Sequence, residues 1–169
     1  MNIFRLFVVM VAFSGFPLLS HAQDTGTYVG IGVTSFEFDT YGLNGKLGYN
    51  LSKNFAVESE GFVGLTKKTS NFGTSLLTSK VNYSIAAYAV AKIPLTEQFE
   101  IFARGGYHNT RLSVKNQLVG TKGDIDGFAV GGGAGYNLSE KNSIRLEYTY
   151  LDGSYANIDT VAISFMHKF

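Results

Sequence analysis

The last nine residues, 161–169, read V-A-I-S-F-M-H-K-F, and large apolar side chains occupy alternate positions along them. Successive side chains of an extended chain point to opposite faces, so Val161, Ile163, Phe165 and Phe169 share one face. An alternation with a period of two residues indicates a β-strand. The other apolar alternations after residue 22 have the same period, and we therefore expect an all-β protein.

The first 22 residues have the pattern of a secretory signal peptide. One positive charge, Arg5, precedes an apolar run over residues 6–19, and small residues lie near Ala22. We expect cleavage before Gln23, which leaves one domain over residues 23–169. The alternative, an uncleaved transmembrane anchor, is disfavoured because the run is shorter than the roughly 20 apolar residues of a spanning helix.

Composition narrows the possible chemistry. The chain has no cysteine, which excludes disulfides, thiolate metal sites and cysteine nucleophiles. It has 14 basic and 13 acidic side chains, and loss of Arg5 with the signal peptide balances the two. A neutral chain argues against nucleic acid as a partner.

A repeated pentapeptide marks one end of the molecule. G-Y-N-L-S at 48–52 recurs at 135–139, and a weaker copy, I-P-L-T, occupies 93–96. We interpret these as tight turns, and the polar segments 35–40, 66–79, 113–125 and 152–158 as loops at the opposite end. The breaks predict eight strands, at 26–34, 41–50, 55–65, 80–93, 99–112, 126–137, 143–151 and 159–169. An even number of strands with short turns and long loops is typical of an eight-stranded antiparallel up-and-down transmembrane β-barrel.

The two faces of these strands differ sharply in charge. One face carries no Asp, Glu, Lys or Arg, and its members besides the C-terminal set are Val29, Ile31, Val33, Tyr41, Leu43, Leu47, Tyr49, Phe55, Val57, Val63, Val81, Tyr83, Ile85, Ile93, Phe99, Ile101, Tyr107, Phe128, Val130, Tyr136, Ile144, Leu146, Tyr148 and Tyr150. The opposite face carries Lys46, Glu58, Glu60, Lys92, Glu100, Arg104, Arg145, Glu147 and Lys168.

A soluble barrel of lipocalin type would turn the apolar face inward, whereas a membrane barrel turns it toward lipid. The charged face is also rich in glycine, and small residues suit the crowded interior of eight strands. Tyrosines near strand ends on the apolar face fit the aromatic girdles at membrane interfaces. These features favour the membrane barrel.

Several motifs resemble one protein family. The segments 48–51, 102–107, 132–136 and 144–148, together with the terminal Phe169, are similar to outer-membrane β-barrels such as the OmpA membrane domain, OmpX and the neisserial opacity proteins, the small barrels of the porin family. The ending, with Val161, Ile163, Phe165 and Phe169, resembles the C-terminal insertion signal of such proteins.

The resemblance implies an integral protein of the cell outer membrane in a Gram-negative bacterium, surrounded by lipid bilayer and lipopolysaccharide. It implies handling by periplasmic chaperones and the barrel-assembly machinery. It also implies adhesion, serum resistance or envelope integrity through the loops, with host surface molecules as candidate partners and Lys67 and Lys68 as candidate loop contacts. We expect a monomer, because a closed barrel pairs all its backbone groups internally.

The inward charges suggest a plug. If Tyr49 faces Phe55 across the first turn, Lys46 lies opposite Glu58 on the neighbouring strand. Six residues at similar heights are predicted to form an ion network that fills the lumen: Lys46, Glu58, Glu60, Arg104, Arg145 and Glu147. The alternative is a small-conductance porin that passes ions.

Chemical activity has weaker support. His108-Asn109-Thr110 is the nearest match to the His and Ser, two residues apart, of an outer-membrane lipid A deacylase, with threonine in place of serine. We expect no enzymatic activity, because a nucleophile needs an activating base with its own orienting group. Asp124 and Asp126 provide too few carboxylates for an EF-type calcium loop, and we expect neither metal nor cofactor.

Overall fold

The computed structural model describes residues 25–169 except 38–39, 73–74, 116–119 and 154–156. The predicted signal peptide, residues 1–22, lies outside these described residues. Nine strands are present in the described part: β1 (Gly26–Phe36), β2 (Thr40–Asn50), β3 (Phe55–Gly64), β4 (Lys68–Phe72), β5 (Ser75–Pro94), β6 (Phe99–Lys115), β7 (Gly120–Asn137), β8 (Asn142–Leu151) and β9 (Ile158–Lys168). Among the same residues, no helix has the length and apolar character needed to cross a bilayer.

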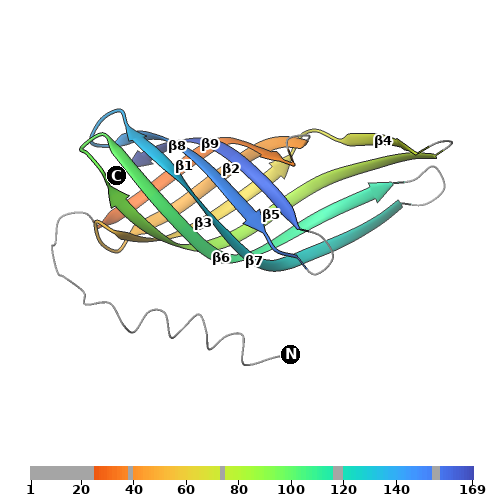
Figure 1. The fold of residues 1–169 in the computed structure, drawn as a ribbon, viewed down its shortest axis with the longest axis horizontal. Coiled ribbons are helices and arrows are strands. Elements are labelled where there is room, and N and C mark those ends of the chain that lie inside the picture. Colours follow the sequence, from red (N-terminus) through yellow and green to blue (C-terminus); the bar gives the residue numbers. More distant parts are fainter. Residues whose placement is uncertain (1–24, 38–39, 73–74, 116–119, 154–156) are drawn as a thin grey trace, which may run out of the picture.

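Eight of the strands close into an antiparallel barrel (Figure 1). Neighbours in sequence pair along the sheet, β1 pairs with β9, and β3 pairs with β5 to complete the ring. The fourth strand, β4, lies outside the ring and pairs only with β5. The predicted eight-stranded up-and-down barrel is confirmed, because closure gives every barrel strand two partners and leaves no open edge in lipid.

Two hairpins extend well beyond the rest of the barrel. β5, β6 and β7 span 20, 17 and 18 residues, whereas β1, β2, β3, β8 and β9 span 10 or 11. Together with β4, the outer parts of these strands form a sheet that reaches past the barrel rim (Figure 1). We call the described residues of segments 65–82 and 111–125, from their base at the barrel rim outward, the β4–β7 projection.

The projection corrects two predicted loops. The sequence predicts loops at 66–79 and 113–125, yet these segments contain β4 and the ends of β5, β6 and β7. The expectation relied on apolar alternation, which marks a strand only where one face meets lipid or a core. Outside the membrane both faces can be polar, and serine- and threonine-rich segments then form a ladder without that signal.

The register at the first turn also differs from the prediction. Tyr49 lies opposite Val57 instead of Phe55, and Lys46 lies opposite Glu60 instead of Glu58. The reason is the position of the turn, because the Phe55 carbonyl accepts hydrogen bonds from the backbone N–H groups of both Leu51 and Ser52. The turn is therefore centred on Lys53, one residue later than the predicted pairing requires. Phe55 therefore closes the turn and cannot pair with Tyr49.

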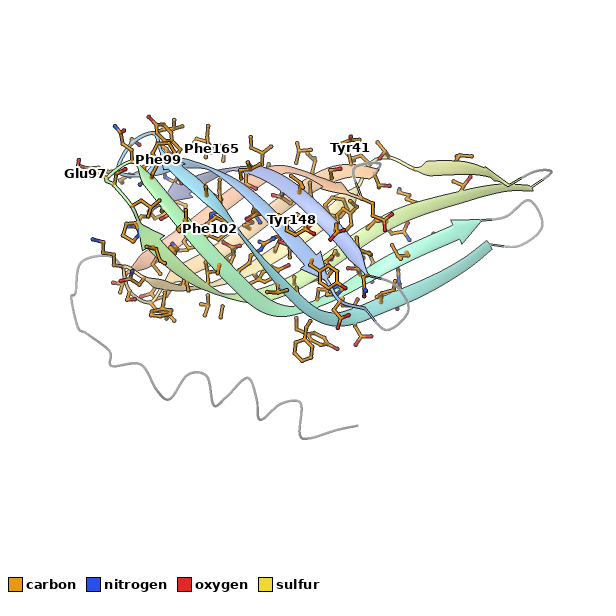
Figure 2. All side chains as sticks on the ribbon, in the orientation of Figure 1. Tyr41, Glu97, Phe99, Phe102, Tyr148 and Phe165 are labelled. Atoms are coloured by element: carbon orange, nitrogen blue, oxygen red, sulfur yellow. The ribbon has the colours of Figure 1, made fainter. Side chains whose placement is uncertain are left out.

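The two faces of the barrel are divided as the alternation predicts, with one exception. Bulky apolar side chains such as Ile31 and Leu146 are 64% and 55% exposed on the outside, and Phe99, Phe165 and Tyr41 project from the outer surface in Figure 2. Val81 is the exception, because it was expected outside and is buried within the lumen. The β5–β6 register shifts between Val81 and Tyr83, and such a bulge reverses the facing of the residues beyond it.

The inside of the barrel is filled by side chains. Toward the loop end lies an apolar layer in which the Phe36 and Phe62 rings are 4.4 Å apart. The buried apolar residues of this layer, which we call the outer apolar layer, are Phe36, Phe62, Val81, Ile125, Ala129, Leu151 and Ile158. Below it the lumen becomes polar and charged.

Candidate functional site in the barrel lumen

The structure brings the six inward charges named above into one group, the central ion cluster. They project from four strands, β2, β3, β6 and β8. Lys46 Nζ lies 2.6 Å from Glu60 Oε2, and Arg104 Nη1 lies 2.7 Å from the same oxygen. Arg145 Nη1 lies 2.7 Å from Glu58 Oε2. Glu147 contacts Lys46 and lies 3.3 Å from Arg104. The cluster therefore ties opposite walls of the barrel together.

Burial makes the balance of charge in this cluster important. Five of the six side chains are at most 4% exposed, and that of Glu60 is 12% exposed. An unpaired charge at such depth costs several kcal/mol. Here three cations face three anions, and each has an opposite charge within 4.0 Å. Glu147 accepts no hydrogen bond of good geometry, so Lys46 and Arg104 compensate its carboxylate by charge alone.

Aromatic and hydroxyl groups, which the charge pattern of the sequence does not predict, complete the cluster. The Tyr28 hydroxyl donates to Glu58 Oε2 at 2.9 Å, and the Arg104 guanidinium donates to Thr149 Oγ1 at 3.0 Å from Nε. Arg104 also lies over the Tyr88 ring at 4.3 Å, and Arg145 lies over the Phe102 ring at 4.6 Å. Such cation–π contacts stabilise a desolvated guanidinium. Each of these residues occupies an inward-facing position of its strand, and this position is the sequence signal that places it in the lumen: Tyr28, Tyr88, Phe102 and Thr149.

Glycine makes room for one of these aromatic groups. A Cβ atom built on Gly48 would overlap the Tyr28 ring, which packs directly against the β2 backbone. The residues directly opposite in the β1–β2 ladder are Tyr28 and Gly48. The Tyr28 ring can therefore lie beneath the ion cluster because its neighbour, Gly48, has no side chain.

The lumen opens into a cavity at the tight-turn end. Its volume is about 720 Å³, and its walls include Tyr28, Lys92, Arg145, Met166 and Lys168. The Lys92 ammonium donates to Asn50 Oδ1 at 2.6 Å and lies 5.0 Å from the centre of the Tyr28 ring. We call this space the turn-end cavity. In outer-membrane barrels the short turns face the periplasm.

The motif considered for catalysis faces the wrong way for a lipid substrate. His108 is 1% exposed and points into the lumen. Its Nδ1 lies 3.0 Å from Thr110 Oγ1, and its Nε2 lies 3.1 Å from the backbone carbonyl of Asp152. The Thr110 hydroxyl lies 2.8 Å from Ser84 Oγ. The imidazole thus connects Thr110 of its own strand, β6, with the backbone after β8, and Thr110 in turn contacts β5. A backbone carbonyl occupies the position where a catalytic histidine would need a carboxylate.

The carboxylates considered for calcium have protein partners. Asp124 accepts two hydrogen bonds from Arg111, at 2.6 and 2.7 Å. Asp126 accepts a hydrogen bond from the Tyr107 hydroxyl. Both pairs lie in the loop-end half of the β6–β7 hairpin.

The remaining predicted residues lie on and just after β9 and around the start of β4. Ile163 and Phe165 project outward from β9 and are 54% and 46% exposed, Val161 is half-buried on the same face, and Phe169 follows the strand at 70% exposure. Lys67 is exposed between β3 and β4, and Lys68 begins β4 at the opposite end of the molecule.

A closed barrel with a bulky apolar exterior and a charged, filled interior is an integral outer-membrane protein, because only this arrangement satisfies a β-sheet backbone within lipid. Residues 6–169 match the model of the outer membrane protein beta-barrel domain, and the chain belongs to this family. The predicted resemblance and the location in the cell outer membrane are thereby confirmed, and the apolar exterior contacts the lipid bilayer. Among curated protein sequences none matches the chain.

Solved structures with this fold include barrels of different activities. The attachment invasion locus protein Ail of Yersinia pestis, solved with the heparin analogue sucrose octasulfate, is 14% identical with a TM-score of 0.64, covering 87% of this chain and all of that one. The N-terminal β-barrel domain of Pseudomonas aeruginosa OprF is 13% identical with a TM-score of 0.65, at the same coverage. The outer membrane enzyme PagL is 12% identical with a TM-score of 0.55, covering 84% and 99% of the two chains. At these identities the likeness concerns the fold alone.

Proposed function

We propose that this protein is a non-enzymatic surface scaffold whose sealed barrel holds the β4–β7 projection outside the cell, where its lysines bind an anionic polysaccharide. The observation that carries the proposal is the separation of charge between the two parts of the chain. The projection contains six basic residues, Lys67, Lys68, Lys80, Arg111, Lys115 and Lys122, and one acidic residue, Asp124. The rest of the chain after residue 22 therefore has an acidic excess.

Within these two segments the sequence offers one acidic residue for six basic ones. Arg111 forms a bidentate salt bridge with Asp124. The same segments contain no other acidic residue that could pair with the five lysines. Clustered lysines attract sulfate and phosphate groups and raise the rate of encounter with a polyanion. The sulfated ligand named for the Ail structure supports this class of partner. Lipopolysaccharide phosphates and sulfated host glycans both belong to it.

The sealed lumen is the second part of the proposal. The outer apolar layer and the central ion cluster lie one below the other, so an ion crossing the barrel would have to displace both. Paired charges whose side chains are almost fully buried hold their positions, and the predicted plug is therefore favoured over a small-conductance pore. Planar-bilayer recordings of the pure protein should show no stable single-channel openings. Large, regular openings would refute the plug without affecting the polysaccharide proposal.

Polysaccharide binding can be tested with matched charge reversals. Lys67→Glu/Lys68→Glu changes the projection, whereas Lys53→Glu/Lys141→Glu makes the same change in exposed turns at the opposite end. The protein in nanodiscs should bind immobilised heparin in low salt. The affinity should fall at least tenfold in Lys67→Glu/Lys68→Glu and should be unchanged in Lys53→Glu/Lys141→Glu. Equal loss in both variants would show a diffuse effect of net charge and refute a site on the projection.

The class of protein also sets the expected biogenesis and assembly state. We propose passage through the periplasm with chaperones, insertion by the barrel-assembly machinery, and function as a monomer, supported by closure of the barrel without a second copy. Crosslinking in native membranes would test the monomer, and a specific dimer band would contradict it.

A further inference from the structure

The turn-end cavity contains more positive charge than the central ion cluster needs. Its lining contains five cations, Lys53, Lys92, Lys141, Arg145 and Lys168, and three carboxylates, Glu97, Glu100 and Glu140. Arg145 is paired with Glu58 above the cavity. Lys92 has no carboxylate within 4.0 Å among the described residues, and its ammonium donates a hydrogen bond to the neutral amide oxygen of Asn50 at 2.6 Å.

A buried ammonium with a neutral partner has hydrogen-bonding capacity to spare. Lys92 is only 9% exposed, yet an ammonium has three N–H donors and one of them is used by Asn50. Burial without a counter-ion costs free energy, and an anion entering the cavity would recover part of that cost. The charges of Arg145, Glu100, Glu58 and Lys168 also act on Lys92. Since these charges are of both signs, the attraction for an anion comes mainly from the Lys92 ammonium itself.

The shape of the site limits the kind of anion. Lys92 and Arg145 both lie near the Tyr28 ring, with Nζ and Cζ at 5.0 and 5.6 Å from its centre, so one small ligand beside this ring can meet both cations. A guanidinium and an ammonium together match the several oxygens of a phosphate group. The cavity, at about 720 Å³, has ample room for such a ligand.

We propose that the turn-end cavity binds a phosphate group from the periplasmic side, held by Lys92 and Arg145. The ligand is a small phosphorylated solute or the headgroup of a phospholipid, since both present the same oxygens. This site is separate from the lysines of the β4–β7 projection, which lie at the opposite end of the barrel. The two proposals can therefore fail independently.

Isothermal titration calorimetry tests the site on the full protein in a non-ionic detergent, with inorganic phosphate as the probe. The wild type should bind saturably, and Lys92→Met should weaken binding about tenfold or more, as expected for loss of a charged hydrogen bond. Lys92→Arg should retain binding, which keeps the test decisive if the methionine variant does not fold. Lys67→Gln, which removes one charge at the other end, should bind as the wild type does.

Further titrations identify the source of the phosphate. Glycerol 3-phosphate and a short-chain phosphatidylglycerol are compared with inorganic phosphate on the same samples. Binding of the free solutes supports a soluble ligand, and binding of the lipid alone supports a headgroup. Binding of none of the three, or an equal loss in Lys92→Met and Lys67→Gln, would overturn the proposal.

Discussion

Replacing Glu58 by glutamine removes the anion on which Arg145 depends. Glu58 lies 2.7 Å from Arg145, 3.4 Å from Arg104 and 3.9 Å from Lys46. Arg104 and Lys46 keep Glu60 and Glu147 as partners, whereas Arg145 has no other carboxylate within 4.0 Å among the described residues. The variant thus leaves one guanidinium, whose side chain is 4% exposed, without a counter-charge.

The size of the effect follows from this loss. Removing one partner of a buried pair costs about 3–5 kcal/mol, and glutamine preserves the volume, so we expect about 3 kcal/mol. The double variant Glu58→Gln/Arg145→Gln removes both charges, and we expect it to recover more than about 1 kcal/mol relative to the sum of the single variants. Recovery would assign the cost to the unpaired charge instead of to packing.

Urea unfolding of the protein in lipid vesicles measures these free energies. The chain has no tryptophan, so far-ultraviolet circular dichroism and the folded band on unheated gels are the suitable signals. Glu97→Gln, in an exposed turn, is the matched control and should change stability by less than about 0.5 kcal/mol. If Glu58→Gln were no more destabilising than this control, the central ion cluster would not stabilise the barrel and our reasoning would be wrong.

Two further predictions concern the barrel wall and the projection. Gly48→Ala should destabilise the protein by about 1–3 kcal/mol in the same urea assay, because the added Cβ would overlap the Tyr28 ring. The control, Gly45→Ala on the outer face, has no atom within 4 Å of its Cβ and should leave stability unchanged. Equal effects of the two variants would contradict this packing. Arg111 lowers the pKa of the Asp124 carboxyl by hydrogen bonding to it, so the pair should stabilise the projection above the ordinary aspartate pKa, and that contribution should disappear as the pH falls through the lowered value. An NMR titration of Asp124 should show its midpoint rise toward the ordinary value in Arg111→Gln, and an unchanged midpoint would exclude the pair.

The sequence predicts the faces of the strands better than their register. Lys46, Glu58 and Arg104 could be placed inside the barrel because each position in a regular strand has a fixed facing, whatever its partner. Their partners depend on where the turn lies, and the first turn is centred one residue later in the sequence than predicted. Val81 was misplaced for a related reason, since a bulge shifts facing without leaving a clear signal in the residue pattern.

The pattern of charges alone does not reveal other parts of the site. Tyr28 and Tyr88 lie at inward positions of β1 and β5 and could have been assigned to the lumen by parity alone. Their role beneath or beside guanidinium groups depends on distances across the barrel, which the alternation does not contain. The strand character of the β4–β7 projection was also hidden, because the water on both of its sides imposes no apolar period.

The pairing of the first strand with the last has a consequence for the timing of assembly. Tyr28 lies opposite Lys168, and the ladder continues to Phe36 and Thr160. Until β9 arrives, both β1 and β8 present an unpaired edge, which hydrocarbon cannot satisfy. A chain that stops before residue 158 would hence remain an open sheet whose unpaired strand edges can associate with other chains. The barrel can enter the bilayer as a closed structure only after β9 has been supplied.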